Sequence, residues 1–156
     1  HSPHKVKKLF LVSPAGAPMS ESGFEEVRSH FRVNTAADGR AFIRRLFHKP
    51  PWYTSLIGGS VTRMLNQGAV RVFLDPETEV ETLTQVDIQT LEPQTVLLWG
   101  TEERLLPEEC LRWYRANMPA HVTILRPENY GHSPHLEYPA DLASRLIDFA
   151  KDADMT

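Results

Sequence analysis

Residues 95–125, TVLLWGTEERLLPEECLRWYRANMPAHVTIL, hold a strand, a helix and a second strand in succession. The apolar runs TVLLW (95–99) and HVTIL (121–125) are typical of short strands buried on both faces of a sheet. Between them, Pro107 suits a first helical turn, two glutamates follow it, and an apolar stripe continues to Met118. Two strands joined by one helix in so short a stretch must pair in parallel, nearly always through a right-handed connection.

The flanking sequence extends this unit in both directions. Residues 6–12, VKKLFLV, predict a third buried strand, which ends at the turn sequence SPAG. Pro139 opens a predicted last helix that should pack on the sheet through one apolar face. That face consists of Leu142, Ala143, Leu146, Ile147 and Ala150. The predicted fold class is therefore α/β, a parallel sheet with flanking helices.

Residues 14–92 carry helical stripes and breakers but no further buried strand. Thr35 and Asp38 resemble a capping box that starts a helix with an apolar face, and Pro50 and Pro51 end it. A second stripe is expected through Trp52, Leu56, Met64 and Leu65, with Gly58 and Gly59 as its weak point. An insertion this long between two strands is more than a connection, so 14–92 is interpreted as a helical cap or lid.

Composition excludes several classes of protein. The 156 residues fit one domain, and 41% hydrophobic with 24% charged residues is typical of a soluble globular chain without a membrane span. A formal net charge of -3 argues against nucleic acid as a partner. The single cysteine, Cys110, forbids an internal disulfide and suits a reducing compartment, so a cytoplasmic location is expected. The chain begins with His1 rather than Met, which predicts a start inside a longer polypeptide.

Acid and base candidates follow the second and third predicted strands. Ligands bind beyond the carboxyl ends of the strands in open parallel sheets, so functional residues are expected in the loops at these ends. Their candidates are Glu102, Glu103, Glu128, His132, His135 and Glu137. Because the two strands flank one crossover, an acid in GTEER and a histidine in GHSPH are expected to lie side by side. The acid would then fix the tautomer of an imidazole that acts as general base.

Three motifs resemble the C-terminal half of the α/β-hydrolase fold family, serine hydrolases of the esterase or lipase-like kind. They are KVKKLFLVSPAG (5–16), WGTEERLLP (99–107) and GHSPHLEYP (131–139), which match family patterns such as WGxxDxxxP and GHxxxxExP. By this resemblance 1–156 is the C-terminal portion of such a domain, with 14–92 at the place of the family's helical cap.

The resemblance also assigns roles to individual residues. His132 matches the family's catalytic histidine. Glu103 stands where the family usually has aspartate, so the acid is Glu103, its neighbour Glu102, or a group elsewhere. Trp52 in the cap is a candidate for contact with an acyl group, whereas Trp99 and Trp113 are predicted to be structural.

The family's nucleophile motif, GxSxG, does not occur in the sequence. GGSVT (58–62) lacks the second glycine and lies in the predicted cap, and Ser13 is interpreted as a turn residue. The family carries its nucleophile elbow and oxyanion-hole loop before the segment that this chain resembles. The expectation is therefore that the N-terminal half of the fold lies outside this chain and that the isolated chain is inactive.

The resemblance further implies an ester or related acyl substrate. The expected partner is the N-terminal half of the fold, on the same polypeptide or a second chain, or a second copy of this chain in a homodimer. The alternative is a non-catalytic protein-interaction module that keeps the half-fold. Neither a cofactor nor a metal is expected: HSPH occurs at 1–4 and at 132–135, but no carboxylate stands at a metal-ligand spacing such as HExxH. The first copy is predicted to lie at the amino end of the sheet, far from His132.

Overall fold

A three-stranded parallel sheet forms the centre of the molecule, which a computed structural model describes for residues 5–75 and 78–151. The strands are β1 (Lys8–Val12), β2 (Gln94–Leu98) and β3 (Thr123–Leu125), in the order β1-β2-β3. Phe10 is paired with Val96, and Val96 with Thr123. The predicted α/β class and the parallel strand, helix, strand unit are therefore confirmed.

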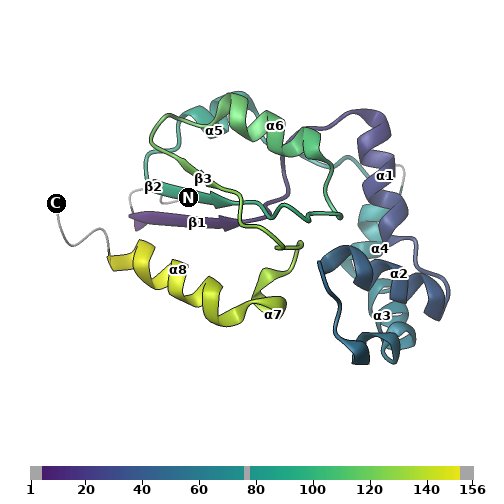
Figure 1. The fold of residues 1–156 in the computed structure, drawn as a ribbon. Helices are drawn as coiled ribbons and strands as arrows, with labels where there is room; N and C mark the ends of the chain where they lie inside the picture. Colours follow the sequence, from purple (N-terminus) through teal and green to yellow (C-terminus); the bar gives the residue numbers. More distant parts are fainter. Residues whose placement is uncertain (1–4, 76–77, 152–156) are drawn as a thin grey trace.

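Helices occupy three positions around this sheet (Figure 1). Helices α5 (Gln85–Gln89) and α6 (Glu108–Asn117) lie on one side, and α7 (Pro134–Glu137) and α8 (Pro139–Lys151) on the other. The remaining helical segments lie beyond the ends to which the strand arrows point. They are α1 (Glu21–Phe31), α2 (Ala36–Leu46), the 3-10 turn η2 (Trp52–Ser55), α3 (Gly58–Leu65) and α4 (Ala69–Leu74). The cap boundaries of 14–92 stay a prediction, since α5 lies beside the sheet.

Local sequence explains where the cap helices begin and end. The Thr35 hydroxyl accepts a hydrogen bond from the Asp38 amide, and the Asp38 carboxylate accepts one from the Thr35 amide, so the predicted capping box at the start of α2 is present. Helix α2 ends at Leu46, and Phe47 leaves it in an extended conformation ahead of Pro50. The segment after Leu46 therefore turns back toward the body of the molecule.

Two hydrophobic clusters meet at the loop after β2. The main cluster lies between the sheet and α6, where Leu97, Trp99, Leu111 and Tyr114 are almost completely buried. The second lies within the cap and contains Val33, Phe42, Leu65 and Leu105. Leu105 comes from the loop after β2, whereas its neighbour Leu106 packs in the main cluster. This loop therefore joins the cap to the body.

Two predicted apolar stripes are not buried as expected. Of the stripe predicted in the cap only Leu65 is buried, whereas Trp52, Leu56 and Met64 are exposed. The reason is that η2 and α3 are separate elements, so these positions do not share one helix face. On α8 only Leu142 is buried; Ala143, Leu146, Ile147 and Ala150 are exposed, because this face points away from β1 to β3.

Gly100, at the end of β2, allows the two loops beyond the strands to touch. A Cβ at this position would lie 2.0 Å from the Tyr130 carbonyl oxygen. Gly100→Ala is therefore expected to lower the free energy of unfolding by roughly 1–3 kcal/mol, as overpacking does. Gly59→Ala is the matched control, since a Cβ there meets nothing within 4 Å, and it should stabilise by about 0.4–1 kcal/mol. Urea unfolding measures both, and equal effects would contradict the close approach.

Candidate active site

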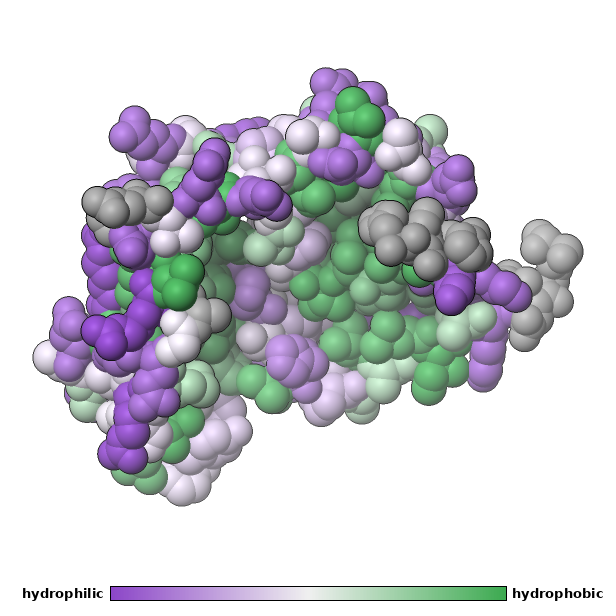
Figure 2. Space-filling view, turned by 180° about the vertical axis from the view of Figure 1, so that it is seen from behind, coloured by the Kyte–Doolittle hydropathy of each residue, from purple (hydrophilic) through white to green (hydrophobic). Residues whose placement is uncertain are grey.

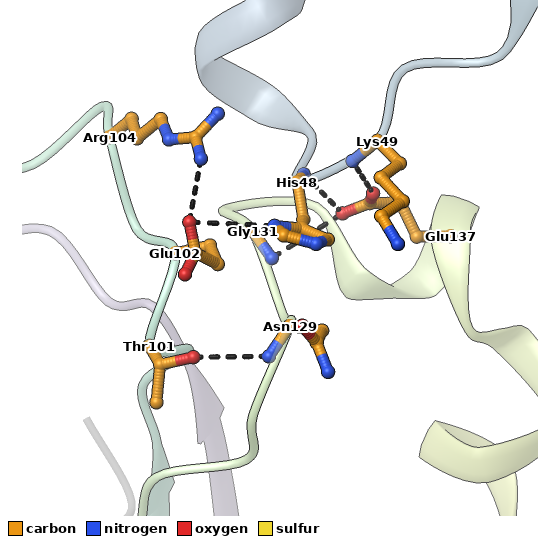
Figure 3. Close-up of polar contacts among 8 residues, drawn as sticks. All are labelled: His48, Lys49, Thr101, Glu102, Arg104, Asn129, Gly131 and Glu137. Atoms are coloured by element: carbon orange, nitrogen blue, oxygen red, sulfur yellow. Dashed lines mark hydrogen bonds and ion pairs between the residues drawn. The ribbon is translucent and has the colours of Figure 1, made fainter.

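Backbone hydrogen bonds hold together the loops after β2 and β3. The Glu102 amide donates to the Tyr130 carbonyl at 3.0 Å, and the Thr101 amide donates to the Pro127 carbonyl at 3.1 Å. The Thr101 hydroxyl in turn accepts from the Asn129 amide at 3.0 Å (Figure 3). These contacts extend the strand pairing past the sheet, so the two loops keep a fixed relative position.

This position brings Glu103 and His132 into direct contact. His132 Nδ1 lies 2.9 Å from Glu103 Oε2, although the two residues are 29 positions apart. The other carboxylate oxygen, Oε1, accepts from the Leu105 amide at 2.8 Å and the Leu106 amide at 3.1 Å. With both oxygens bound, the carboxylate cannot rotate freely, and it holds the imidazole in the orientation with Nδ1–H toward the acid.

Burial and hydrogen bonding act in opposite directions on Glu103, whose side chain is 3% exposed. Burial alone raises the pKa of its carboxyl, but the hydrogen bond and charge of His132, together with the Leu105 amide, lower it further than burial raises it. The net pKa is below the ordinary glutamate value, so Glu103 is a carboxylate at neutral pH. Its His132 partner is 23% exposed and faces a cavity.

Ser13, directly after β1, lies at the same edge of the sheet. Its backbone has a positive φ of 42°, a conformation that few residues other than glycine adopt, and its side chain is buried. Its hydroxyl is near enough to favour the charged form of Glu103, although its geometry falls short of a hydrogen bond. The sequence predicted that Ser13 is a turn residue, and its positive φ is consistent with a turn. The sequence did not predict that Ser13 lies close to Glu103.

The other acid and base candidates do not join this pair. Glu102 binds Arg104 at 2.6 Å and lies 3.4 Å from His48 Nδ1, so the acid that contacts His132 is Glu103 (Figure 3). Glu137 accepts hydrogen bonds from the His48 and Lys49 amides. Glu128 and His135 are exposed.

A cavity of about 620 Å³ adjoins the imidazole, between the cap and the sheet. Most of its wall is apolar and includes Phe24, Phe31 and Phe73 from the cap and Leu106 from the loop after β2. Ser13 and His132 are among its few polar residues. Trp52 does not line it, so the structure does not place the predicted acyl contact there. Within residues 5–75 and 78–151, Nε2 of His132 has no hydrogen-bond partner.

No group of three His, Cys, Asp or Glu side chains gathers as metal ligands in the described part of the chain. The first HSPH copy, with His1 and His4, lies outside the described residues, so its predicted place at the amino end of the sheet stays a prediction. The described helices include none that is both long and apolar enough to cross a bilayer.

Comparison with solved structures identifies the fold. The chain superposes on a 2-hydroxy-6-oxo-6-phenylhexa-2,4-dienoate hydrolase from a Rhodococcus strain with a TM-score of 0.75 and 16% identity, covering 96% of this chain and 57% of that one. A meta-cleavage product hydrolase from Pseudomonas fluorescens gives 0.74 and 14%, with 97% and 59% covered. A carboxylesterase from Bacillus subtilis gives 0.70 and 17%, with 97% and 53% covered.

These similarities show that the chain has part of the α/β-hydrolase fold. It spans a little over half the length of each of these structures. No family profile and no curated protein matches the sequence.

The lowered pKa of Glu103 predicts a pH-dependent stability. A carboxylate of this kind stabilises the fold above its unfolded pKa of about 4.3, and that contribution is lost as the pH falls through the lower, folded value. Glu103→Gln should lower the free energy of unfolding at neutral pH by about 1–3 kcal/mol. Below about pH 4.5 it should also flatten the dependence on pH. Urea unfolding over a pH series measures this against Glu128→Gln in the exposed part of the neighbouring loop. Parallel profiles for wild type and Glu103→Gln would count against the buried contact.

Proposed function

We propose that this chain is the acid- and histidine-bearing part of a serine hydrolase that cleaves a carboxylic ester or a related acyl substrate. The observation that supports the proposal most strongly is the 2.9 Å contact between buried Glu103 and His132, which lines an apolar cavity. Acyl transfer by a serine nucleophile requires an imidazole as general base, a carboxylate that orients this imidazole, and a cavity that binds the substrate beside it.

His132 is the general base in this proposal. Because Nδ1–H donates to Glu103, the neutral imidazole has its lone pair on Nε2, which has no partner among the described residues. Nε2 would take the proton of an attacking serine hydroxyl and return it to the departing alkoxide. Glu103 stays ionised and stabilises the imidazolium that forms between these steps. The apolar wall of the cavity suits the acyl or alcohol group of an uncharged substrate.

The nucleophile and the oxyanion donors belong to residues outside this chain in the same proposal. Acyl transfer needs an activated nucleophile and preorganised donors for the oxyanion, and no GxSxG occurs in the sequence. The partial coverage of the matched hydrolase structures, 57% for the Rhodococcus protein, supports the same conclusion.

Two surfaces would receive the missing part of the fold. β1 pairs with β2 on one side only, so its other edge has backbone donors and acceptors that no described strand satisfies. On α8, the face formed by Ala143, Leu146, Ile147 and Ala150 is exposed. Figure 2 shows hydrophobic residues gathered over the half of the molecule that contains the sheet. We propose that the N-terminal half of the fold, from the same polypeptide or a second chain, covers both surfaces.

The same open edge favours a second candidate function, a non-catalytic interaction module. Such a module would use β1 to add a strand from another protein, or from a second copy in a homodimer, without any acyl chemistry. Loss of His132 would then have no effect on its activity, which separates the two candidates.

Replacement of His132 tests the catalytic proposal in the intact protein. With p-nitrophenyl butyrate as the probe substrate, His132→Ala should lower kcat/KM by at least about 1,000-fold, because both proton transfers are lost. His135→Ala is the matched control: this imidazole is three residues away and exposed, and the change should alter kcat/KM less than about twofold. Equal activities of the wild type and His132→Ala would exclude the assignment.

Replacement of Ile147 tests whether α8 is covered. An aspartate at a position that a further part of the fold covers would be a buried, unpaired charge, so Ile147→Asp should lower the free energy of unfolding of the intact protein by about 2 kcal/mol or more. Ser144→Asp, at an exposed position of the same helix outside the apolar stripe, should stay within about 0.5 kcal/mol. If both variants unfold like the wild type, the α8 face is free in solution and the proposed coverage is wrong.

A further inference from the structure

The residues on both sides of His132 contact the end of α2. The Ser133 amide donates to the Leu46 carbonyl at 2.9 Å. Gly131 lies so close to the same segment that a Cβ would be 2.8 Å from both the His48 amide nitrogen and the Leu46 carbonyl oxygen. The His132 loop and the end of α2 are therefore in direct backbone contact.

The Glu137 carboxylate stabilises the contact between the His132 loop and the end of α2. Oε1 accepts from the Lys49 amide at 2.9 Å, and Oε2 accepts from the His48 amide at 3.0 Å and the Gly131 amide at 3.4 Å (Figure 3). One carboxyl side chain thus binds amides of the cap and of the His132 loop at once. Hydrogen bonds to a charged acceptor are stronger than neutral ones, so the carboxylate reinforces the backbone bond between Ser133 and Leu46.

The loop that carries Glu103 reaches the same point. Glu102 Oε2 binds Arg104 and lies 3.4 Å from His48 Nδ1, on the side of His48 away from Glu137 (Figure 3). His48 therefore lies between the loop of the acid and the loop of the histidine. The segment after α2 therefore contacts both loops through His48.

From these contacts we propose that Glu137 is a positioning residue: it couples the end of α2 to the His132 loop and so holds the imidazole against Glu103. The inference rests on the proposed function, since the orientation of His132 matters for catalysis only if this residue is the base. It deepens that function because the cap, besides walling the cavity, controls the alignment of the acid and the base. Movement of the cap at α2 thus changes the orientation of His132 as well as access to the cavity.

Nuclear magnetic resonance of the intact protein tests the coupling without any measurement of turnover. Glutamine keeps the shape of Glu137 but has a single acceptor oxygen and no charge, so Glu137→Gln loses at least one of the two cap amides. The amides of His48 or Lys49 should then exchange with solvent roughly tenfold faster or more. The Nδ1–H resonance of His132, which reports the hydrogen bond to Glu103, should weaken or shift in the same variant.

Glu128→Gln is the matched control, because Glu128 is an exposed carboxylate that precedes His132 by four residues. It should leave the exchange rates and the His132 resonance as in the wild type. If Glu137→Gln exchanges faster at the cap amides while the His132 resonance stays unchanged, Glu137 has a structural role only and the proposal is overturned. Unchanged exchange overturns it as well.

Gly131→Ala provides a second test, in which residue Glu137 itself is unchanged but the added Cβ would lie 2.9 Å from its Oε2. Its Cβ would push the His132 loop away from the end of α2, so the same His132 resonance should shift or disappear. A Gly131→Ala protein with the wild-type resonance contradicts the coupling. Because these readouts do not involve a substrate, absence of ester hydrolysis would refute the proposed function while leaving the coupling itself open to confirmation.

Discussion

The geometry of the candidate site depends on the hydrogen bond between His132 Nδ1 and the Glu103 carboxylate. It joins two loops 29 residues apart and depends on the parallel pairing of β2 with β3, which brings the carboxyl ends of both strands to one edge. The Leu105 and Leu106 amides hold the second carboxylate oxygen, so the acid is fixed before it meets the imidazole. Loss of the β2–β3 pairing, or of the Leu105 and Leu106 amide contacts, would leave an oxygen of the buried Glu103 carboxylate without a hydrogen-bond partner. An unpaired buried carboxylate oxygen destabilises the folded state.

The cap takes part in the same arrangement. Leu105 anchors the acid loop in the hydrophobic cluster of the cap, while Glu137 and Ser133 anchor the histidine loop at the end of α2. The apolar cavity lies between these two attachments and the sheet. Cap position, cavity shape and the alignment of acid and base are therefore linked through shared residues.

The sequence was sufficient for those features that depend on local pattern and chain order. Apolar runs separated by one amphipathic helix predicted β2, α6 and β3, and adjacency of the two strands predicted that Glu103 and His132 meet. The capping box at Thr35 is likewise a local signal, and it is present. The catalytic roles of Glu103 and His132 stay predictions, since geometry alone does not test them.

Features that depend on distant partners could not be predicted in this way. The apolar stripe of α8 was expected to be buried, but burial depends on what lies across from a helix, and of the stripe only Leu142 is buried, in a cluster with Leu98 of β2. The role of Glu137 was hidden because its carboxylate binds backbone amides about 88 residues earlier in the chain, and any sequence can supply an amide. Phe47, the residue after Leu46, is extended, and this conformation brings the His48 and Lys49 amides within hydrogen-bonding distance of Glu137. Hydrophobic periodicity does not predict such a change of direction.

The central claim is that this chain supplies the acid and the base to a serine that it does not itself contain. Labelling of the intact protein with a fluorophosphonate, followed by mass-spectrometric mapping of the modified residue, tests it most directly. The account predicts one labelled serine outside residues 1–156, with labelling lost in His132→Ala. Stoichiometric labelling of Ser13, or of another serine within this chain, would contradict it.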